Sequence, residues 1–181
     1  MREVMARGAA AAFVCVLLIG FSVTGCREPA SGAAAAAVGG IEGAQVAEFK
    51  LSALDGRELT PASLRGKVVI VDFWDTWCGP CLRAMPHLKE LSLRHPDDVV
   101  VVAIALGQEG EAKVREVVAR LGVPFPVVLF GAQGDLTPAF GNIEQLPTTF
   151  LLGPDGVIRR RWVGAQSLPT YESAVKSLLP S

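Results

Sequence analysis

The sequence lacks an excess of charge of either sign, since 17 Lys and Arg residues stand against 18 Asp and Glu residues, for a formal net charge of −1 at pH 7. This balance gives no electrostatic footprint for nucleic acid, so we expect no nucleic-acid partner. No repeat of fixed period is visible, and 19 glycines with 12 prolines are too few for a low-complexity chain. Half of the 181 residues are hydrophobic, which excludes a wholly disordered chain and suffices for one domain without disulfide staples.

The first 25 residues have the pattern of an export signal. Arg2 and Arg7 accompany an apolar run from Gly8 to Phe21. The Val-Thr-Gly-Cys sequence ending at Cys26 resembles a bacterial lipobox, which implies cleavage before Cys26 and lipidation of that residue. An uncleaved membrane anchor and an ordinary signal peptide are the alternatives. Each version places the rest of the chain outside the cytoplasm, in the periplasm or on the outer cell surface.

Residues 26–45 are rich in Ala and Gly and have little to bury, so we expect a lipidated flexible tether, with a short helix through the alanines as the alternative. Residues 46–181 are expected to form one folded domain. Cys15 leaves with the signal and Cys26 is committed to lipid. Only Cys78 and Cys81 remain, and two cysteines so close in sequence cannot form a disulfide scaffold.

The folded part alternates strand and helix patterns. Near-continuous apolar runs, typical of strands covered on both faces, span residues 68–73 and 99–106. Helical spacing of apolar residues is found in residues 82–91, 114–121 and 171–179. Turn signals predict one hairpin around residues 55–56 and another between strands 148–152 and 157–163, beside a short strand at 127–130. These patterns predict an α/β domain with a mixed central sheet flanked by helices and an N-terminal β-hairpin.

The chemistry is concentrated in the sequence Trp77-Cys78-Gly79-Pro80-Cys81, which ends the first apolar strand and begins a helix. Cysteines at i and i+3 on a first helical turn can close a small disulfide ring. Cys78 would lie at the helix N-terminus, where unsatisfied amides and the helix dipole favour a thiolate, the attacking species in disulfide exchange. Cys81, one turn further on, would be shielded and suited to resolving a mixed disulfide.

A structural zinc site is the main alternative for a Cys-x-x-Cys pair. Zinc needs four ligands, usually from a second pair of cysteines or from histidines. No second pair exists, and His87 and His95 are the only histidines. We interpret both as solvated residues on a helix surface. The sequence therefore predicts neither a metal nor another cofactor.

The domain resembles thioredoxin and, more closely, the extracytoplasmic thiol:disulfide oxidoreductases of the TlpA/ResA type. The resemblance covers residues 46–179 and rests on four stretches: Val71-Asp72-Phe73-Trp74, the Cys78 motif followed by Met85-Pro86, residues 146–151, and Val163-Gly164-Ala165. It implies a thioredoxin fold with the N-terminal hairpin and a central insertion. It also implies that Cys78 is the nucleophile and Cys81 the resolving thiol, joined as the redox disulfide.

The same resemblance implies a cis peptide bond between Leu146 and Pro147, facing the disulfide. A substrate peptide could pair in strand fashion with the backbone of Leu146 there. The expected substrate-binding residues are Trp77, Gly79, Pro80, Leu146 and Pro147.

Asp72 lies within an apolar strand, where a carboxylate is expensive unless it has partners or a chemical task. In thioredoxin-like proteins the matching position is a buried acid that assists proton transfer at the resolving thiol, and burial should raise its pKa. A satisfied structural acid is the alternative. Asp75 departs from the family, in which a small residue is common. We interpret it as a solvated loop charge; a carboxylate that opposes thiolate formation at Cys78 is the alternative.

The leading functional hypothesis is an extracytoplasmic, membrane-tethered thiol:disulfide oxidoreductase that reduces protein disulfides. The Gly79-Pro80 pair matches thioredoxin, a reductant. The family implies a transmembrane thiol donor of the DsbD or CcdA kind and, as one client, apocytochrome c during cytochrome c biogenesis. A thiol peroxidase of the peroxiredoxin type is a second hypothesis, but its motif places Thr three residues before the peroxidatic cysteine, where this chain has Asp75. A copper chaperone of the Sco type needs one more residue between the cysteines and a distant His.

Overall fold

The computed structural model describes residues 41–179 of the 181-residue chain. The predicted leader 1–25, the predicted lipidation site Cys26 and most of the predicted tether lie outside these residues. Within the described range, no helix combines the length and the apolar character needed to cross a membrane.

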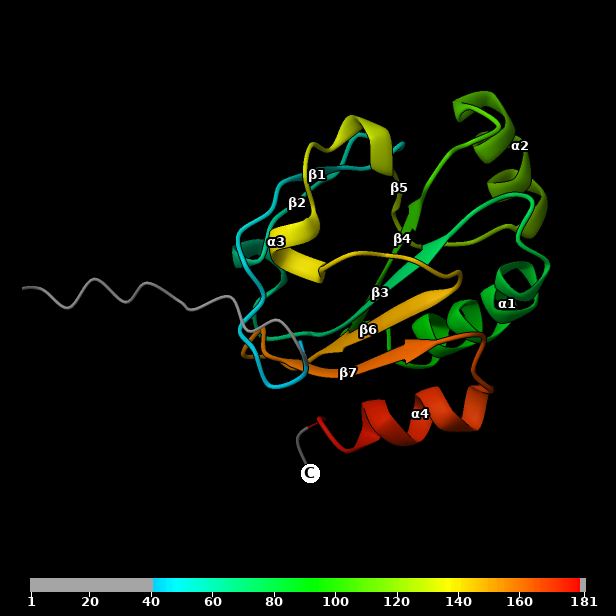
Figure 1. Ribbon diagram of the computed structural model, residues 1–181. Helices are drawn as coiled ribbons and strands as arrows, with labels where there is room; N and C mark the ends of the chain where they lie inside the picture. Colours follow the sequence, from blue (N-terminus) through cyan, green and yellow to red (C-terminus); the bar gives the residue numbers. More distant parts are fainter. Residues whose placement is uncertain (1–40, 180–181) are drawn as a thin grey trace, which may run out of the picture. The chain divides into compact units, whose positions relative to one another are not determined.

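A five-stranded mixed sheet forms the centre of the domain (Figure 1). Its strands are β3 (Val68–Trp74), β4 (Val99–Ala105), β5 (Val127–Leu129), β6 (Thr148–Leu152) and β7 (Ile158–Val163). They lie in the order β5–β4–β3–β6–β7, with β3, β4 and β5 parallel, β6 antiparallel to β3, and β7 antiparallel to β6. Every residue of β3 is buried, as its continuous apolar run predicts for a central strand.

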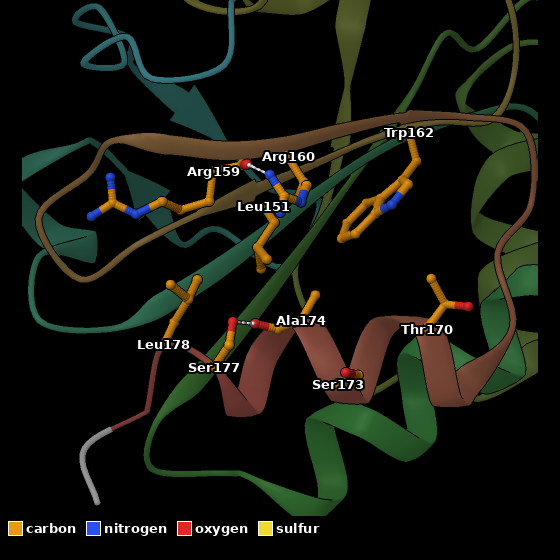
Figure 2. A pocket seen from close by; sticks show the side chains of 9 residues that line it. All are labelled: Leu151, Arg159, Arg160, Trp162, Thr170, Ser173, Ala174, Ser177 and Leu178. Atoms are coloured by element: carbon orange, nitrogen blue, oxygen red, sulfur yellow. Dashed lines mark hydrogen bonds between the residues drawn. The ribbon is translucent and has the colours of Figure 1, made fainter.

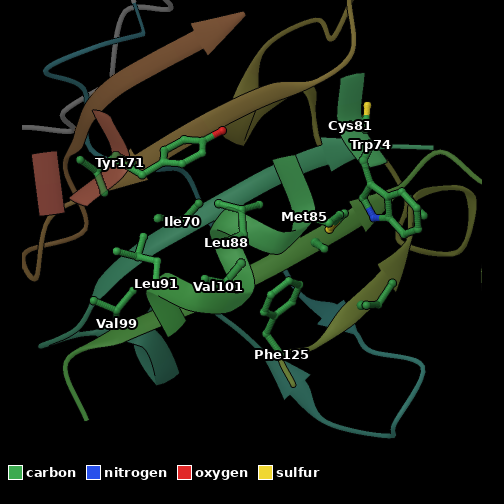
Figure 3. Packing of buried hydrophobic residues seen from close by; sticks show 14 of the residues in the cluster. Ile70, Trp74, Cys81, Met85, Leu88, Leu91, Val99, Val101, Phe125 and Tyr171 are labelled. Carbon is green, nitrogen blue, oxygen red and sulfur yellow. The ribbon is translucent and has the colours of Figure 1, made fainter. Parts of the chain in front are cut away.

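Three helices contribute to the hydrophobic cluster on one face of the sheet: α1 (Gly79–Arg94), α2 (Glu111–Leu121) and α4 (Leu168–Lys176). Leu88 of α1, Val117 of α2 and Tyr171 of α4 all belong to it, and Figure 3 shows part of this packing. The predicted end of α2 is confirmed, because Gly122 adopts the left-handed conformation (φ 57°) in which helices commonly end.

The opposite face is covered by the predicted N-terminal hairpin, formed by β1 (Leu51–Ser52) and β2 (Glu58–Leu59), and by the short helix α3 (Thr137–Phe140). Two 3-10 turns, Ala62–Leu64 and Phe130–Ala132, connect these pieces. The hydrophobic cluster on this face is the second core of the domain, and aromatic rings fill it. The centroid of Phe140 lies 5.4 Å from that of Phe73 and 5.3 Å from that of Phe150. The helical spacing of a four-residue helix is too short to detect in sequence, which is why α3 was not predicted.

The predicted tether boundary at residue 45 is wrong, because the chain joins the fold earlier. Gly43 N donates to Ile158 O (2.7 Å), and Ile158 N donates to Ala44 O (2.9 Å). Ile41 packs on the second core. Residues 41–45 are thus added to the outer edge of β7, where unpaired backbone groups would otherwise face solvent.

The histidines are also less exposed than predicted. His87 is half-buried, and its Nδ1 lies 3.2 Å from the carbonyl oxygen of Gln166 at the start of α4. His95 is half-buried at the end of α1, and its Nε2 has no partner among the described residues. The packing of α1 against α4 and the sheet, which helical spacing alone does not specify, explains the difference.

Candidate active site

The two cysteines of the motif form a disulfide with a sulfur–sulfur distance of 2.01 Å. Cys78 is the N-cap of α1, and its sulfur accepts a hydrogen bond from Cys81 N at 3.3 Å. Pro80 occupies the first turn, where its missing N–H costs no helical bond. The predicted position of the pair, between the end of β3 and the start of α1, is confirmed. A thiolate at Cys78 would meet the amides and dipole of a helix N-terminus.

The surroundings of the pair differ on its two sides. Cys81 is fully buried in the hydrophobic cluster beneath α1, α2 and α4, whereas Trp77, directly before Cys78, is 54% exposed. Cys78 itself retains only 3% exposure. The exposed surface next to the disulfide therefore lies on the Trp77 side.

The Leu146–Pro147 peptide bond is cis, as expected. Leu146 packs against the cluster that contains both cysteines, and Pro147 O accepts a hydrogen bond from Gly164 N at 2.8 Å. Within residues 41–179, neither the N–H nor the carbonyl of Leu146 has a hydrogen-bond partner. These two backbone groups are thus unpaired within the described residues.

Asp72 is completely buried near the middle of β3. Because side chains alternate along a strand, Asp72 shares its face with Ile70 and Trp74, which belong to the same cluster as Cys81. Thr149 Oγ1 of β6 donates to Asp72 Oδ1 at 2.7 Å. Burial raises the pKa of Asp72 to about 7, and the hydrogen bond from Thr149 only partly opposes this effect.

A count of protons shows which oxygen of Asp72 is available. Thr149 has one hydroxyl proton and gives it to Asp72 Oδ1, so the hydroxyl of Tyr171, 3.2 Å away, must donate to Thr149 Oγ1. Asp72 Oδ2 has no partner among the described residues. A proton that binds Asp72 therefore occupies Oδ2. Burial and the nearby Asp72 charge raise the pKa of Tyr171 to about 12, so Tyr171 remains a donor at neutral pH.

The interpretation of Asp75 as a solvated charge is wrong, because its side chain has no exposed surface. Its Oδ1 accepts from Thr76 N at 2.7 Å, and its Oδ2 accepts from Gln108 N at 3.1 Å. The carboxylate thus lies between two loops and is satisfied by their backbone amides, which compensates for its removal from water.

Several residues near the motif were not found from the sequence. Thr149 and Tyr171 are brought to Asp72 by strand register and by the packing of α4. Arg83 lies one helical turn after Gly79, and its Nη1 would lie 3.6 Å from a Cβ on Gly79. The only available signals were the alternation of β6, which points Thr149 toward Asp72, and the spacing of Gly79 and Arg83 by four residues.

A hollow of about 450 Å³ lies between β7 and α4 (Figure 2) and is separate from the motif. Arg159, Arg160 and Trp162 line it from the sheet side, and Thr170 and Ser177 from the helix. None of its lining residues belongs to the disulfide motif or to the Leu146–Pro147 loop. The hollow is thus not part of the site around the disulfide.

Comparisons with known proteins agree with this geometry. The family model described as Redoxin matches residues 41–179. The thiol-disulfide oxidoreductase ResA of Geobacillus thermodenitrificans is 34% identical over 139 residues, which cover 76% of this chain and 78% of that protein.

Two solved structures give the same result. A thiol:disulfide interchange protein of the thioredoxin family from Chlorobium tepidum TLS has a TM-score of 0.66 at 27% identity, covering 77% of this chain and 98% of that chain. The exposed lipoprotein thioredoxin of Streptococcus pneumoniae TIGR4 has a TM-score of 0.64 at 26% identity, covering 73% of this chain and 100% of that chain. These similarities confirm the thioredoxin fold expected from the sequence.

Proposed function

This chain belongs to the Redoxin family and is a thiol:disulfide oxidoreductase of the ResA type, and from that premise we propose that Cys78 and Cys81 reduce protein disulfides outside the cytoplasm. One observation carries the proposal: the disulfide lies at a helix N-terminus, with exposed Trp77 on one side and a buried resolving cysteine on the other. The first sulfur is thereby suited to attack and the second to release the product.

The proposed cycle is balanced in atoms and electrons. The Cys78 thiolate attacks one sulfur of a client disulfide, so a Cys78–client bond forms while the client bond breaks. The other client sulfur leaves as a thiolate and takes up a proton. Cys81 then loses its proton and attacks the Cys78 sulfur, which forms the Cys78–Cys81 bond and releases the second client thiol. Two electrons pass to the client, and the disulfide form is the oxidised end of the cycle.

Asp72 is proposed as the group that accepts the Cys81 proton. Its open oxygen Oδ2 belongs to the face of β3 that packs around Cys81, and its pKa of about 7 is suited to exchanging protons at neutral pH. An ordinary exposed aspartate would be too weak a base for a thiol at this pH.

Client binding is proposed at the exposed rim of the motif. Trp77 offers an apolar surface, and Gly79 adds no side chain of its own next to Cys78. The free backbone groups of Leu146, next to Pro147, could pair with an extended client segment. This geometry favours an unfolded or extended polypeptide, for which apocytochrome c is a candidate.

The proposed location is the outer side of a membrane, in the periplasm or on the cell surface. Support comes from the leader pattern of residues 1–25, the lipobox-like sequence ending at Cys26 and the Ala/Gly-rich stretch after it. One structural relative is itself an exposed lipoprotein thioredoxin. Because a reductant outside the cytoplasm needs a supply of electrons, we propose a transmembrane thiol carrier of the DsbD or CcdA kind as donor.

The test uses the full chain in detergent, with dithiothreitol as electron donor and insulin as the disulfide probe. We expect wild type to accelerate insulin reduction, Cys78→Ser to be inactive, and Cys81→Ser to accumulate a mixed disulfide through Cys78. Equal activity of wild type and Cys78→Ser would overturn the proposed chemistry.

Location is tested separately in cells. Cys26→Ser should move the protein from the membrane fraction to the soluble extracytoplasmic fraction, while its domain keeps the insulin activity. Retention of Cys26→Ser in the membrane would contradict lipid anchoring and favour an uncleaved anchor.

A further inference from the structure

Asp75 connects the loop that carries Cys78 to a loop from a neighbouring strand. Its Oδ1 accepts from Thr76 N (2.7 Å), and its Oδ2 accepts from Gln108 N (3.1 Å), in the loop between β4 and α2. The carbonyl oxygen of Asp75 accepts from Cys78 N at 3.1 Å. One buried residue therefore fixes both the turn before the disulfide and its distance from the Gln108 loop.

A second contact joins the same two loops. Thr76 Oγ1 hydrogen-bonds to the carboxylate of Glu109, next to Gln108, and lies 3.3 Å from Asp75 Oδ1. A threonine hydroxyl has one proton, so its donation to Glu109 leaves the Thr76 amide as the main donor to Asp75 Oδ1. A small residue at position 75 would leave the amides of Thr76 and Gln108 without this acceptor.

The carboxylate also places an acidic side chain in the same turn as Cys78, whose N–H donates to the Asp75 carbonyl. Within residues 41–179, Asp75 forms no ion pair, and Glu109 adds a second negative charge on the same side of the motif. The positive charge of Arg83 lies over Gly79, on the helix side of the motif. Among the described residues, Asp72 is the other buried acid, and it lies in the hydrophobic core on the side of Cys81.

We propose that Asp75 is a positioning residue of the dithiol, which holds the Cys78 turn in place and keeps the Cys78–Cys81 pair toward the reducing end of its range. The proposal rests on the proposed function, in which this pair is the redox centre. A negative charge near Cys78 disfavours its thiolate. Since a disulfide whose reduced form is stabilised becomes a stronger oxidant, a destabilised thiolate makes the pair a stronger reductant.

The direct test is Asp75→Asn in the full chain in detergent, equilibrated in glutathione buffers. The redox state is read by mass spectrometry of the peptide that contains both cysteines. Asn keeps the size of the side chain, removes its charge and turns an NH₂ group toward one of the two amides. We expect the thiolate-to-thiol ratio of Cys78 to rise about tenfold. In buffers alkaline enough for the Cys78 thiolate to predominate, we expect the equilibrium to shift toward the dithiol by about tenfold, equivalent to about 30 mV for a two-electron couple.

Glu48→Gln is the matched control, because Glu48 is exposed and forms no ion pair within the described residues. It removes the same charge far from the motif in sequence, and its redox equilibrium should equal that of wild type. A merely structural Asp75 would lower stability but leave the redox equilibrium and the Cys78 titration unchanged. That result, or a shift in the opposite direction, would overturn the proposal.

A wild-type measurement covers the case in which Asp75→Asn fails to fold. In the reduced protein, the carboxyl ¹³C resonance of Asp75 should move at the pH at which Cys78 ionises; no movement would overturn the proposal. Failure of the proposed function itself looks different. The wild-type pair would then not equilibrate with glutathione, or Cys78→Ser would remain active on insulin.

Discussion

Two aspartates, separated by only two residues, are both removed from solvent, yet their surroundings are opposite. Asp72 lies inside β3 and receives one hydroxyl proton, from Thr149, while its second oxygen has no partner among the described residues. Asp75 lies in the following loop and receives backbone N–H groups on both oxygens.

The hydrogen-bond donors around a buried carboxylate therefore determine its role. With one donor, desolvation dominates and raises the pKa of Asp72 to about 7, which leaves it able to exchange a proton. With a backbone donor on each oxygen, the Asp75 carboxylate is hydrogen-bonded to both loops and links them. The first carboxylate is suited to chemistry and the second to geometry and electrostatics.

The largest effect is expected for substitutions of Cys78 and Cys81, the pair that Asp72 and Asp75 are proposed to assist. Cys78→Ser removes the attacking sulfur and should lower turnover on a protein disulfide by at least about 10³-fold. Cys81→Ser should instead stop the cycle after one event, with the client held on Cys78. Insulin turnover and non-reducing electrophoresis measure both. Similar phenotypes for the two variants would mean that the cysteines do not have distinct roles.

The proposed contrast between Asp72 and Asp75 requires that Asp72 exchanges protons. Asp72→Asn should slow resolution of the mixed disulfide by about 10²-fold, because no base receives the Cys81 proton. In wild type the rate should rise with pH through about 7, as Asp72 ionises. In the variant this rise should be absent. Rapid-quench measurement of the mixed disulfide gives both rates, and an unchanged pH profile in the variant would contradict the assignment.

The two aspartates should also have opposite effects on stability. The folded pKa of Asp72, about 7, exceeds the value of 3.8 expected when unfolded, so its contribution is fully present below about pH 4 and is lost as pH rises through about 7. At pH 8, Asp72→Asn should therefore stabilise the fold, on the order of 2 to 4 kcal/mol. Asp75→Ala removes the acceptor of the Thr76 and Gln108 backbone amides and should cost roughly 2 to 4 kcal/mol.

Urea unfolding of the oxidised protein at pH 4.5 and 8 measures this contrast. The stabilisation by Asp72→Asn should be much smaller at the lower pH, whereas the cost of Asp75→Ala should persist. Destabilisation by both variants at pH 8 would show that the two sites are alike.

The smallest expected effect tests whether Thr149 and Tyr171 set the proton affinity of Asp72. Thr149→Val removes the hydrogen bond that lowers the pKa of Asp72, so the pH midpoint of resolution should rise. For a bond of about 1 kcal/mol, the proton affinity of Asp72 should increase about fivefold. Tyr171→Phe keeps the ring contact with Trp162 and should have a weaker effect in the same direction. Thr148→Val is the control, because Thr148 is equally buried but donates to Gln145 O. An equal shift in the control would contradict the assignment.

Local patterns were sufficient to predict most of this architecture. The apolar runs predicted β3 and β4, helical spacing predicted α1, α2 and α4, and the motif predicted the disulfide at a helix start. Burial of Asp72 was predictable because a single carboxylate interrupts an apolar strand. Each of these signals lies within a few consecutive residues.

Contacts between distant segments were not predictable. Asp75 is followed by polar Thr76, which is compatible with an exposed loop, and its second partner is a backbone amide 33 residues away that has no sequence signal. Residues 41–45 pair with β7 more than 110 positions further along the chain. Neither composition nor periodicity encodes which loop meets which.

The reduction potential of the Cys78–Cys81 pair tests the central claim most directly. It would be measured on the full chain in detergent, in glutathione and dithiothreitol buffers, by mass spectrometry of the peptide that carries both cysteines. A reductant with a charge-disfavoured thiolate at Cys78 should have a potential near or below about −230 mV, toward the value of about −270 mV for thioredoxin. A potential between about −150 and −120 mV, in the range of strong oxidants, would contradict both the reducing direction and the role of Asp75.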